Sequence, residues 1–341
     1  MGNNKKRASL SCLRVAAILA VVLMHACTTL TDNPDLFVLS QAEQGFFSVL
    51  RRMTTWAVPC FLFISGALLL NGNRTVTVRS CLISVRRMLL VLLLFAVPFA
   101  VVMEYSTTRQ LSLSLIPAAL VRAVGNNSFR HLWYVYMMIG LYLLLPAVRV
   151  FTDHCSRKLL EYVLLVMFAV IFVVPFVSRA AGLSIALALP VETPYLFYLL
   201  LGHYIANCRP EWASRRGLAA AGLVLCGAVI VLYGMREPAG ALVAASYSCP
   251  VTAVLAACVF ILFQGIGGET PKALWTLDRL CFGVYIVHPV FIHLLYRVLG
   301  CAPTGALFPL KTAGILCLVT VASFCASRVL TWIRPISKYV L

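Results

Sequence analysis

Charged side chains are scarce in this sequence, and acidic ones are scarcer than basic ones. Of its 341 residues only 11% are charged and 62% are hydrophobic, and 11 residues are Asp or Glu. An average soluble domain carries about 25% charged residues. This composition cannot cover a folded surface with polar groups, which excludes a soluble globular protein. The sequence instead predicts an all-α, polytopic integral membrane protein with about ten transmembrane helices.

Several motifs that carry enzyme chemistry are missing as well. The sequence contains no Walker P-loop, GxGxxG, HExxH or GxSxG pattern. Its 13 cysteines form no CxxC pair and show no metal-ligand spacing. We interpret them as small apolar residues packed between helices, and we expect no metal site and no tightly bound cofactor. The acidic residues fall at the ends of the apolar stretches or between them, which disfavours a carboxylate-driven transporter.

Ten apolar stretches are candidates for crossing a bilayer. They cover residues 9–30, 46–70, 86–105, 131–150, 159–177, 193–208, 217–234, 247–267, 280–299 and 307–330. The stretch 110–124 is too short to span, and we interpret it as an interfacial or re-entrant piece. The first stretch resembles a signal peptide but lacks a small-x-small cleavage site, so we expect it to be retained. We treat residues 1–341 as a single membrane domain.

Basic residues predict how these helices are oriented. The 28 Lys and Arg residues give a formal net charge of +17, but no basic-aromatic patch indicates binding to nucleic acid. The two tails and the even-numbered connections hold 18 of them, and the odd-numbered connections hold 6. By the positive-inside rule, both termini should lie in the cytoplasm.

The first stretch carries two ionisable residues, Arg14 and His25. A separation of 11 residues returns a helix to the same stripe within about 20°, about 16 Å further along its axis. Ionisable groups inside a span usually face protein or a water-filled cavity. Arg14 should lie near the cytoplasmic end and His25 in the outer half. The residues alone also allow a snorkelling arginine and a histidine with a structural hydrogen bond.

The second stretch contains Pro59, which should kink its helix, and Gly66, which allows a close backbone approach. Arg51 and Arg52 lie at its outer end, either as snorkelling anchors or facing a reaction cavity.

Two later stretches also carry histidines. His131 opens the fourth, where an aromatic belt explains the neighbouring Trp133 but not the histidine itself. In the ninth, Tyr285 and His288 share a helix face, whereas His293 lies about 140° from His288.

Four segments occur in an order that resembles the acyltransferase 3 family of integral membrane acyltransferases. They read LRVAAILAVVLMHA, VPCFLFISGALLL, HLWYVYMMIGLYLLLP and FGVYIVHPVFIHLL. Within the family, the chain is similar to the stand-alone enterobacterial common antigen O-acetyltransferase type. The four segments reach both ends of the chain, so the resemblance is nearly full length. Its most specific part is an arginine followed eleven residues later by a histidine.

The resemblance implies a bacterial cytoplasmic (inner) membrane enzyme. It would take an acyl group, usually acetyl from acetyl-CoA, on the cytoplasmic side and pass it to a hydroxyl of an outward-facing surface glycan or lipid-linked sugar. Some family members transfer succinyl or other groups. The resemblance also implies that Arg14 and His25 are an essential pair, that His131 and Trp133 belong to the HLW signature, and that Tyr285 and His288 match the late signature.

Two positions depart from the family pattern. Relatives often have a basic residue four positions before the proline of the second stretch, where this chain has Thr55; Arg52 lies one turn earlier. Relatives also often show Arg-x-x-Arg at the start of the third stretch. Here Arg87 could be the second arginine, but Ser84 occupies the first position, with Arg86 or Arg79 as possible substitutes.

Acyl transfer to a hydroxyl needs a base, donors for an oxyanion, and cations for the CoA phosphates. We expect the catalytic residues to be His25, Arg14 and His131. The residues expected to bind CoA are Arg14, Arg86 and Arg87, and those expected to bind substrate are Arg52, Trp133, Tyr285 and His288. The sequence leaves open whether His25 acts as a base or is itself acylated, and it indicates no oligomeric state.

Two other classes of protein remain as alternatives. A transporter of a small polar or lipid-linked solute would also place Arg and His within spans, but the chain shows neither an inverted repeat nor deep carboxylates. A non-catalytic membrane scaffold does not explain why Arg14 and His25 share a stripe.

Overall fold

The computed structural model describes residues 2–101, 116–117, 121, 130–183, 185–189, 193–234 and 246–340, with side chains from residue 8 onward. Over these ranges the chain forms helices and no strand, which confirms the predicted all-α class. The predicted interfacial piece at 110–124 lies almost entirely outside the described residues.

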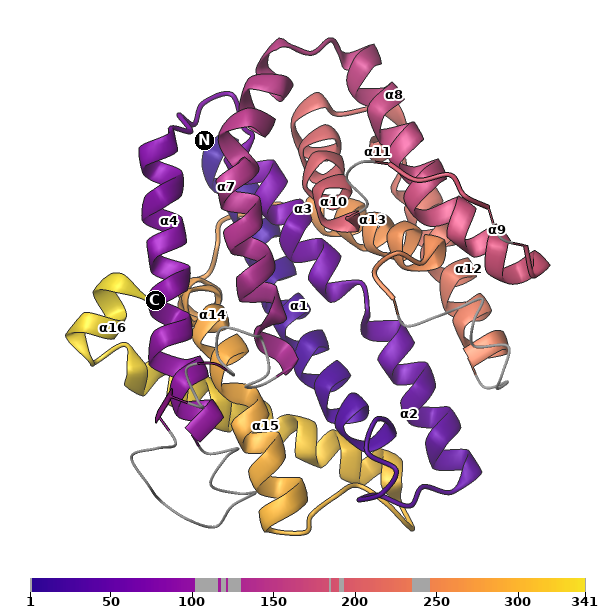
Figure 1. The fold of residues 1–341 in the computed structure, drawn as a ribbon, viewed down its shortest axis with the longest axis vertical. Helices are drawn as coiled ribbons and strands as arrows, with labels where there is room; N and C mark the ends of the chain where they lie inside the picture. Colours follow the sequence, from indigo (N-terminus) through magenta and orange to yellow (C-terminus); the bar gives the residue numbers. More distant parts are fainter. Residues whose placement is uncertain are drawn as a thin grey trace. The chain divides into compact units, whose positions relative to one another are not determined.

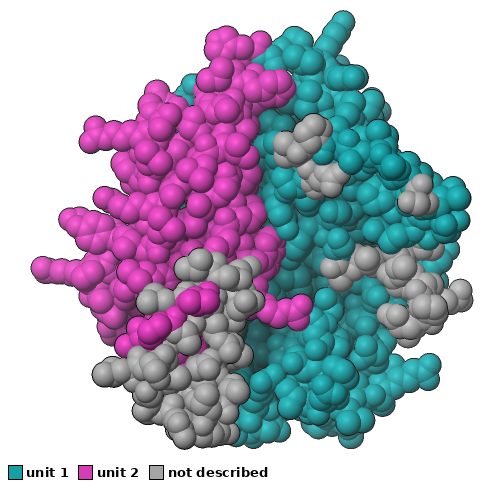
Figure 2. Space-filling view, in the orientation of Figure 1, with its two compact units in different colours: residues 1–74, 155–326 teal, residues 75–154, 327–341 magenta. Residues whose placement is uncertain are grey.

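The chain divides into two compact units, coloured separately in Figure 2: unit 1 is residues 1–74 and 155–326, and unit 2 is residues 75–154 and 327–341. Unit 1 contains, in order, α1 (Gly2–Thr31), α2 (Gln41–Thr54), α3 (Ala57–Leu69), α8 (Arg157–Phe168), η3 (Ala169–Val173), α9 (Val174–Ala181), α10 (Pro194–His203), η4 (Tyr204–Cys208), α11 (Glu211–Ser214), α12 (Arg216–Gly234), α13 (Pro250–Gln264), α14 (Lys272–His293) and η6 (Leu294–Val298) (Figure 1). Unit 2 contains α4 (Val78–Val91), η1 (Leu92–Ala96), η2 (Arg130–Leu132), α7 (Trp133–His154) and α16 (Arg334–Tyr339). Helix α15 (Phe308–Leu330) begins in unit 1 and ends in unit 2.

Eight helical segments of the described chain are long and apolar enough to cross a bilayer. They are Ala8–Thr31, Gln41–Leu69, Val78–Val101, Arg130–His154, Arg157–Ala181, Arg216–Gly234, Lys272–Val298 and Phe308–Leu330. The predicted sixth and eighth stretches correspond to the shorter helices α10 with η4, and α13. The chain is therefore a polytopic membrane protein.

Helices α4 and α14 each begin eight residues earlier than their apolar stretches predict. Helix α4 starts at Val78 because Thr77 and Ser80 form a capping box, in which each side chain bonds the backbone N–H of the other. Helix α14 starts at Lys272, eight residues before the apolar stretch. Arg79, Arg86 and Arg87 are among the basic residues assigned above to an even-numbered connection, and the structure places them within α4 instead, because polar residues extend this helix beyond its apolar core.

At the predicted kink in the second stretch, a turn at residues 55–56 separates α2 from α3 within the helical segment Gln41–Leu69. Pro59 has no N–H to donate to the carbonyl of Thr55, and its ring crowds that carbonyl. In the same turn, the backbone N–H of Thr55 bonds the carbonyl of Arg52, only three residues earlier.

Gly66 brings α3 into backbone contact with α10, as predicted. A Cβ at Gly66 would overlap the carbonyl of Leu199, and a Cβ at Gly202 of α10 would overlap the backbone of Phe63. Small residues that face each other in this way allow two membrane helices to pack at short range. This contact between α3 and α10 lies in the core of unit 1.

An aromatic cluster fills the space around this contact. The rings of Phe63, Phe172, Phe197, Tyr198 and Phe260 pack with centroids 4.8 to 5.7 Å apart. The hydroxyl of Tyr198 donates to the carbonyl of Tyr247 at 2.6 Å. Helix α1 packs against α3 and α13 of this core, and against α14.

Candidate active site

The candidate active site lies along the contact between α1 and α14 in unit 1 (Figure 1). Polar contacts join these helices at two places. Arg14 contacts Asp278 in the first half of each helix, and His25 contacts His288 in the second half of each. The two helices therefore run in the same direction. As the spacing predicts, Arg14 and His25 lie on one face of α1.

The two histidines share a hydrogen bond. His288 Nε2 and His25 Nδ1 lie 2.8 Å apart, and the ring centroids are 4.9 Å apart. His288 has no exposed surface, whereas His25 remains partly exposed. The ring of Tyr285 also lies near His288, with the two ring centroids 6.3 Å apart. The pair thus consists of one residue with no exposed surface and one that keeps some.

The backbone of α14 determines which nitrogen of each ring carries a proton. His288 Nδ1 lies 3.0 Å from the carbonyl oxygen of Val284, which can only accept a hydrogen bond. In a neutral His288 the proton therefore resides on Nδ1, and Nε2 is an acceptor. His25 must then donate from Nδ1, which leaves the lone pair of His25 on Nε2. A basic nitrogen held in this orientation is what a general base requires.

The second contact is an ion pair. Arg14 Nη1 donates to Asp278 Oδ1, and Ser11 Oγ donates to Asp278 Oδ2 at 2.7 Å. Asp278 is 12% exposed and Arg14 is 28% exposed. Sequence reasoning missed both Asp278 and Ser11. A signal was available, because Asp278 precedes His288 by ten residues, nearly the spacing of Arg14 and His25.

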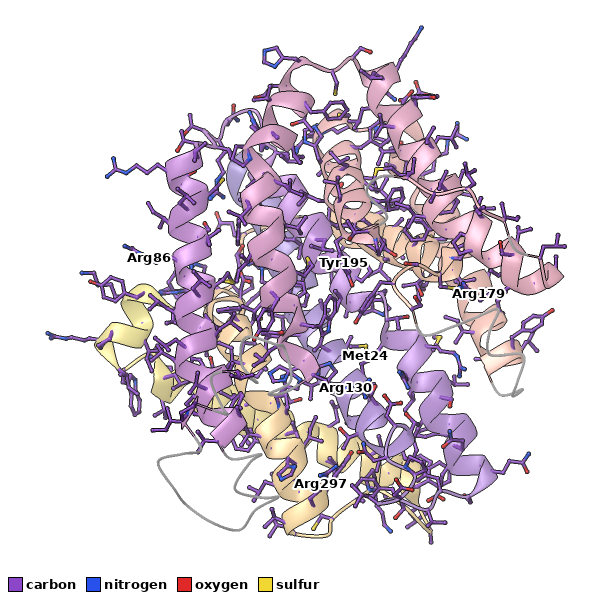
Figure 3. All side chains as sticks on the ribbon, viewed as in Figure 1. Met24, Arg86, Arg130, Arg179, Tyr195 and Arg297 are labelled. Atoms are coloured by element: carbon purple, nitrogen blue, oxygen red, sulfur yellow. The ribbon has the colours of Figure 1, made fainter. Side chains whose placement is uncertain are left out.

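The two arginines of α2 point to different places. Arg51 donates to Asp32 at the end of α1, at 2.6 Å. Arg52, one of the predicted substrate-binding residues, donates to the carbonyl of Gly234 at 3.1 Å, at the end of α12. Arg297 donates to Asn33, next to Asp32, at 3.2 Å, and its position is labelled in Figure 3.

The remaining predicted residues belong to unit 2. His131 is 5% exposed in the short turn before α7, with its ring 6.3 Å from that of Phe99. The ring of Trp133 meets that of Tyr134 edge to face. Arg87 Nε donates to the carbonyl of Val340 at 2.7 Å. These residues and those of the α1–α14 contact lie in different units, so one site containing both remains a prediction.

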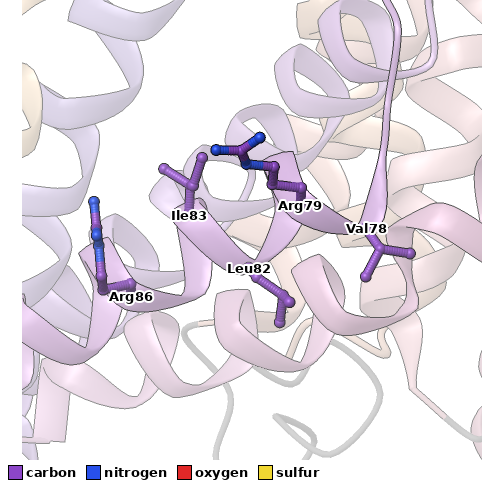
Figure 4. Close-up of a pocket in the computed structure, with 5 residues that line it drawn as sticks. All are labelled: Val78, Arg79, Leu82, Ile83 and Arg86. Carbon is purple, nitrogen blue, oxygen red and sulfur yellow. The ribbon is translucent and has the colours of Figure 1, made fainter.

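Arg86 lines a shallow pocket on α4 together with Val78, Arg79, Leu82 and Ile83. Arg79 and Arg86 project from the same side of the helix as Ile83 (Figure 4). Two guanidinium groups above apolar side chains form a surface that suits an anion joined to an apolar group.

These features define an all-α membrane protein that holds a histidine pair and an ion pair between α1 and α14. The model of the acyltransferase 3 family, described as an acyltransferase domain, matches residues 7–332. The match covers nearly the whole chain, so the chain belongs to this family, as the four sequence segments predict. Comparisons with curated proteins and with solved structures gave no match. Family membership establishes an enzyme that transfers acyl groups.

Proposed function

We propose that the protein transfers an acetyl group from acetyl-CoA to a hydroxyl of a surface glycan or lipid-linked sugar, in the bacterial cytoplasmic membrane. The His25–His288 pair is the observation that carries this proposal. A histidine whose basic nitrogen is directed by a second ring is suited to accept a proton from a hydroxyl.

In the proposed reaction, His25 Nε2 accepts the proton of the sugar hydroxyl while the hydroxyl oxygen attacks the thioester carbonyl. The resulting oxyanion collapses, the carbon–sulfur bond breaks, and the CoA thiolate takes the proton back from His25. The products are the sugar ester and CoA with a free thiol. His288 Nε2 accepts from His25 Nδ1 throughout and so stabilises the imidazolium that forms.

The release of free thiol tests this function directly. Purified protein in lipid nanodiscs should release CoA thiol from acetyl-CoA when it receives surface glycan isolated from cells that lack the protein. Mass spectrometry of that glycan should show the added acetyl mass. A transporter would release no thiol, and that result would overturn the proposal. Succinyl-CoA in place of acetyl-CoA tests the identity of the acyl group.

Labelling from outside the cell should reach a cysteine at position 35. Asp35 is exposed after α1, in a connection that the basic-residue bias predicts to be external. The experiment uses Asp35→Cys in a chain whose exposed Cys301, Cys317 and Cys325 are replaced by serine. The matched control is Arg215→Cys, exposed in a connection predicted to be cytoplasmic, which should label only after lysis. The reverse pattern would place His25 on the cytoplasmic side and contradict the proposed route.

Arg86→Ala and Arg87→Ala should each raise the KM for acetyl-CoA, and added salt should raise the wild-type value. The reason is that both arginines are exposed on the part of α4 predicted to face the cytoplasm, where they would attract the CoA phosphates. The KM for the acceptor should not change, because the acceptor approaches from the other side. Arg179→Ala, exposed at the opposite predicted face, is the control. An unchanged acetyl-CoA KM in both variants would assign these arginines to membrane orientation alone.

A further inference from the structure

The carboxylate of Asp278 is bound by side chains of α1. Both of its oxygens accept hydrogen bonds from that helix, one from Arg14 and the other from Ser11. Arg14 is one of the three arginines that the sequence assigns to the CoA phosphates. In the structure, its guanidinium is already paired with a carboxylate, which offsets the charge that it would offer to a phosphate.

The surroundings make this contact more important than an ion pair at an aqueous surface. The side chain of Asp278 is 12% exposed, and each partner lies in a helical segment long and apolar enough to span a bilayer. Removing one partner there would leave an uncompensated charge in poorly solvated surroundings. Arg14 and Asp278 therefore stabilise each other's charge, and their ion pair binds α1 to α14.

The spacing of the contacts links this ion pair to the histidines. Arg14 and His25 are 11 residues apart on α1, and Asp278 and His288 are ten apart on α14. At 1.5 Å per residue these separations are about 16 and about 15 Å, so two helices running in the same direction can form both contacts at once. A slip of one turn, about 5.4 Å, would break both. The ion pair thus selects the register in which the histidines meet.

We infer that Asp278 is a positioning residue of the active site. Through Arg14 and Ser11 it sets the register of α1 against α14, and this register brings His25 Nδ1 to His288 Nε2. The essential role expected of Arg14 is then to bind Asp278 rather than to bind CoA. This inference rests on the proposed function, because turnover of acetyl-CoA is its readout.

A double-mutant cycle on turnover tests the inference. The proteins are wild type, Asp278→Asn, His288→Ala and the double variant, each purified and compared at equal amounts of folded protein. Asp278→Asn should lower kcat by about tenfold to a hundredfold, because a small misplacement of a catalytic group has effects of this size. The KM for acetyl-CoA should remain unchanged. In the His288→Ala background, the same substitution should lower kcat little further, since the contact that it positions is already gone.

Asp153→Asn is the matched control. It makes the same chemical change in an ion pair within α7, where Asp153 pairs with Arg149 of the same helix, and it should leave kcat and the coupling unchanged. If Asp278→Asn does not accumulate, Ser11→Ala replaces it, since that change removes one of the two hydrogen bonds to Asp278 and keeps the ion pair. Ser11→Ala should lower kcat less and show the same coupling with His288→Ala.

Independent losses in the double variant would overturn the inference and assign Asp278 a general role in stability. A change confined to the acetyl-CoA KM would also overturn it, because Arg14 would then act on CoA. Either result leaves the proposed function intact, since the wild type still releases thiol. Failure of the wild type to release thiol would overturn the proposed function instead.

Discussion

Replacing His25 with alanine should lower the turnover of acyl transfer by about 10²–10⁴-fold, the usual contribution of a general base. His25→Gln should lose as much, because glutamine can keep the hydrogen bond to His288 but cannot accept the proton of a hydroxyl. The KM for acetyl-CoA should change little, because the arginines proposed to bind CoA are retained. Turnover is measured as thiol release per folded molecule.

His154→Ala is the control for this experiment. His154 is exposed at the end of α7, and its loss should leave turnover unchanged. Near-wild-type turnover of either His25 variant would remove His25 from the mechanism. A stable acetyl group trapped on His25 Nε2 of the wild type, found by mass spectrometry of digested protein, would replace the role of base with that of acyl carrier.

Replacing His288 with alanine should lower kcat by about 10²-fold, because His25 loses the partner that orients its ring. His288→Gln should recover much of this activity, since its carbonyl oxygen can occupy the place of Nε2 and accept from His25 Nδ1. The KM values for donor and acceptor should remain unchanged in both variants.

This result would distinguish a positioning residue from a substrate ligand. The sequence predicts that His288 binds substrate, and in that case the KM for the substrate that it binds should rise. In the structure His288 has no exposed surface and hydrogen-bonds His25, which favours the positioning role. Equal activity of the alanine and glutamine variants would contradict the tautomer that Val284 imposes, because only the glutamine variant restores the acceptor.

Much of the fold can be predicted from the sequence because membrane burial depends on local composition. An apolar stretch of sufficient length forms a helix whatever it packs against, since every backbone polar group must be satisfied within the helix. Arg14 and His25 also follow local rules, because the helix period alone puts them on one stripe. The same applies to Pro59, whose effect acts on the carbonyl four residues earlier.

The partners of these residues were decided by tertiary structure. Asp278 and His288 lie more than 260 residues beyond Arg14 and His25, and no local rule brings α14 rather than another helix to the stripe on α1. Gly66 predicts a close approach, but only packing selects α10 as the partner. Likewise, two adjacent arginines on α2 look equivalent in the sequence, yet Arg51 faces the end of α1 and Arg52 faces the end of α12.

By itself, the sequence determined that this protein is an all-α membrane protein of the acyltransferase 3 family, with a cation and an imidazole on one face of its first helix. Tertiary structure alone decided that the cation meets a carboxylate and the imidazole meets a second imidazole. The physical reason is the range of the interactions. Hydrophobicity and helix period act over neighbouring residues, whereas a hydrogen bond between distant side chains forms only where packing brings its two atoms to about 3 Å.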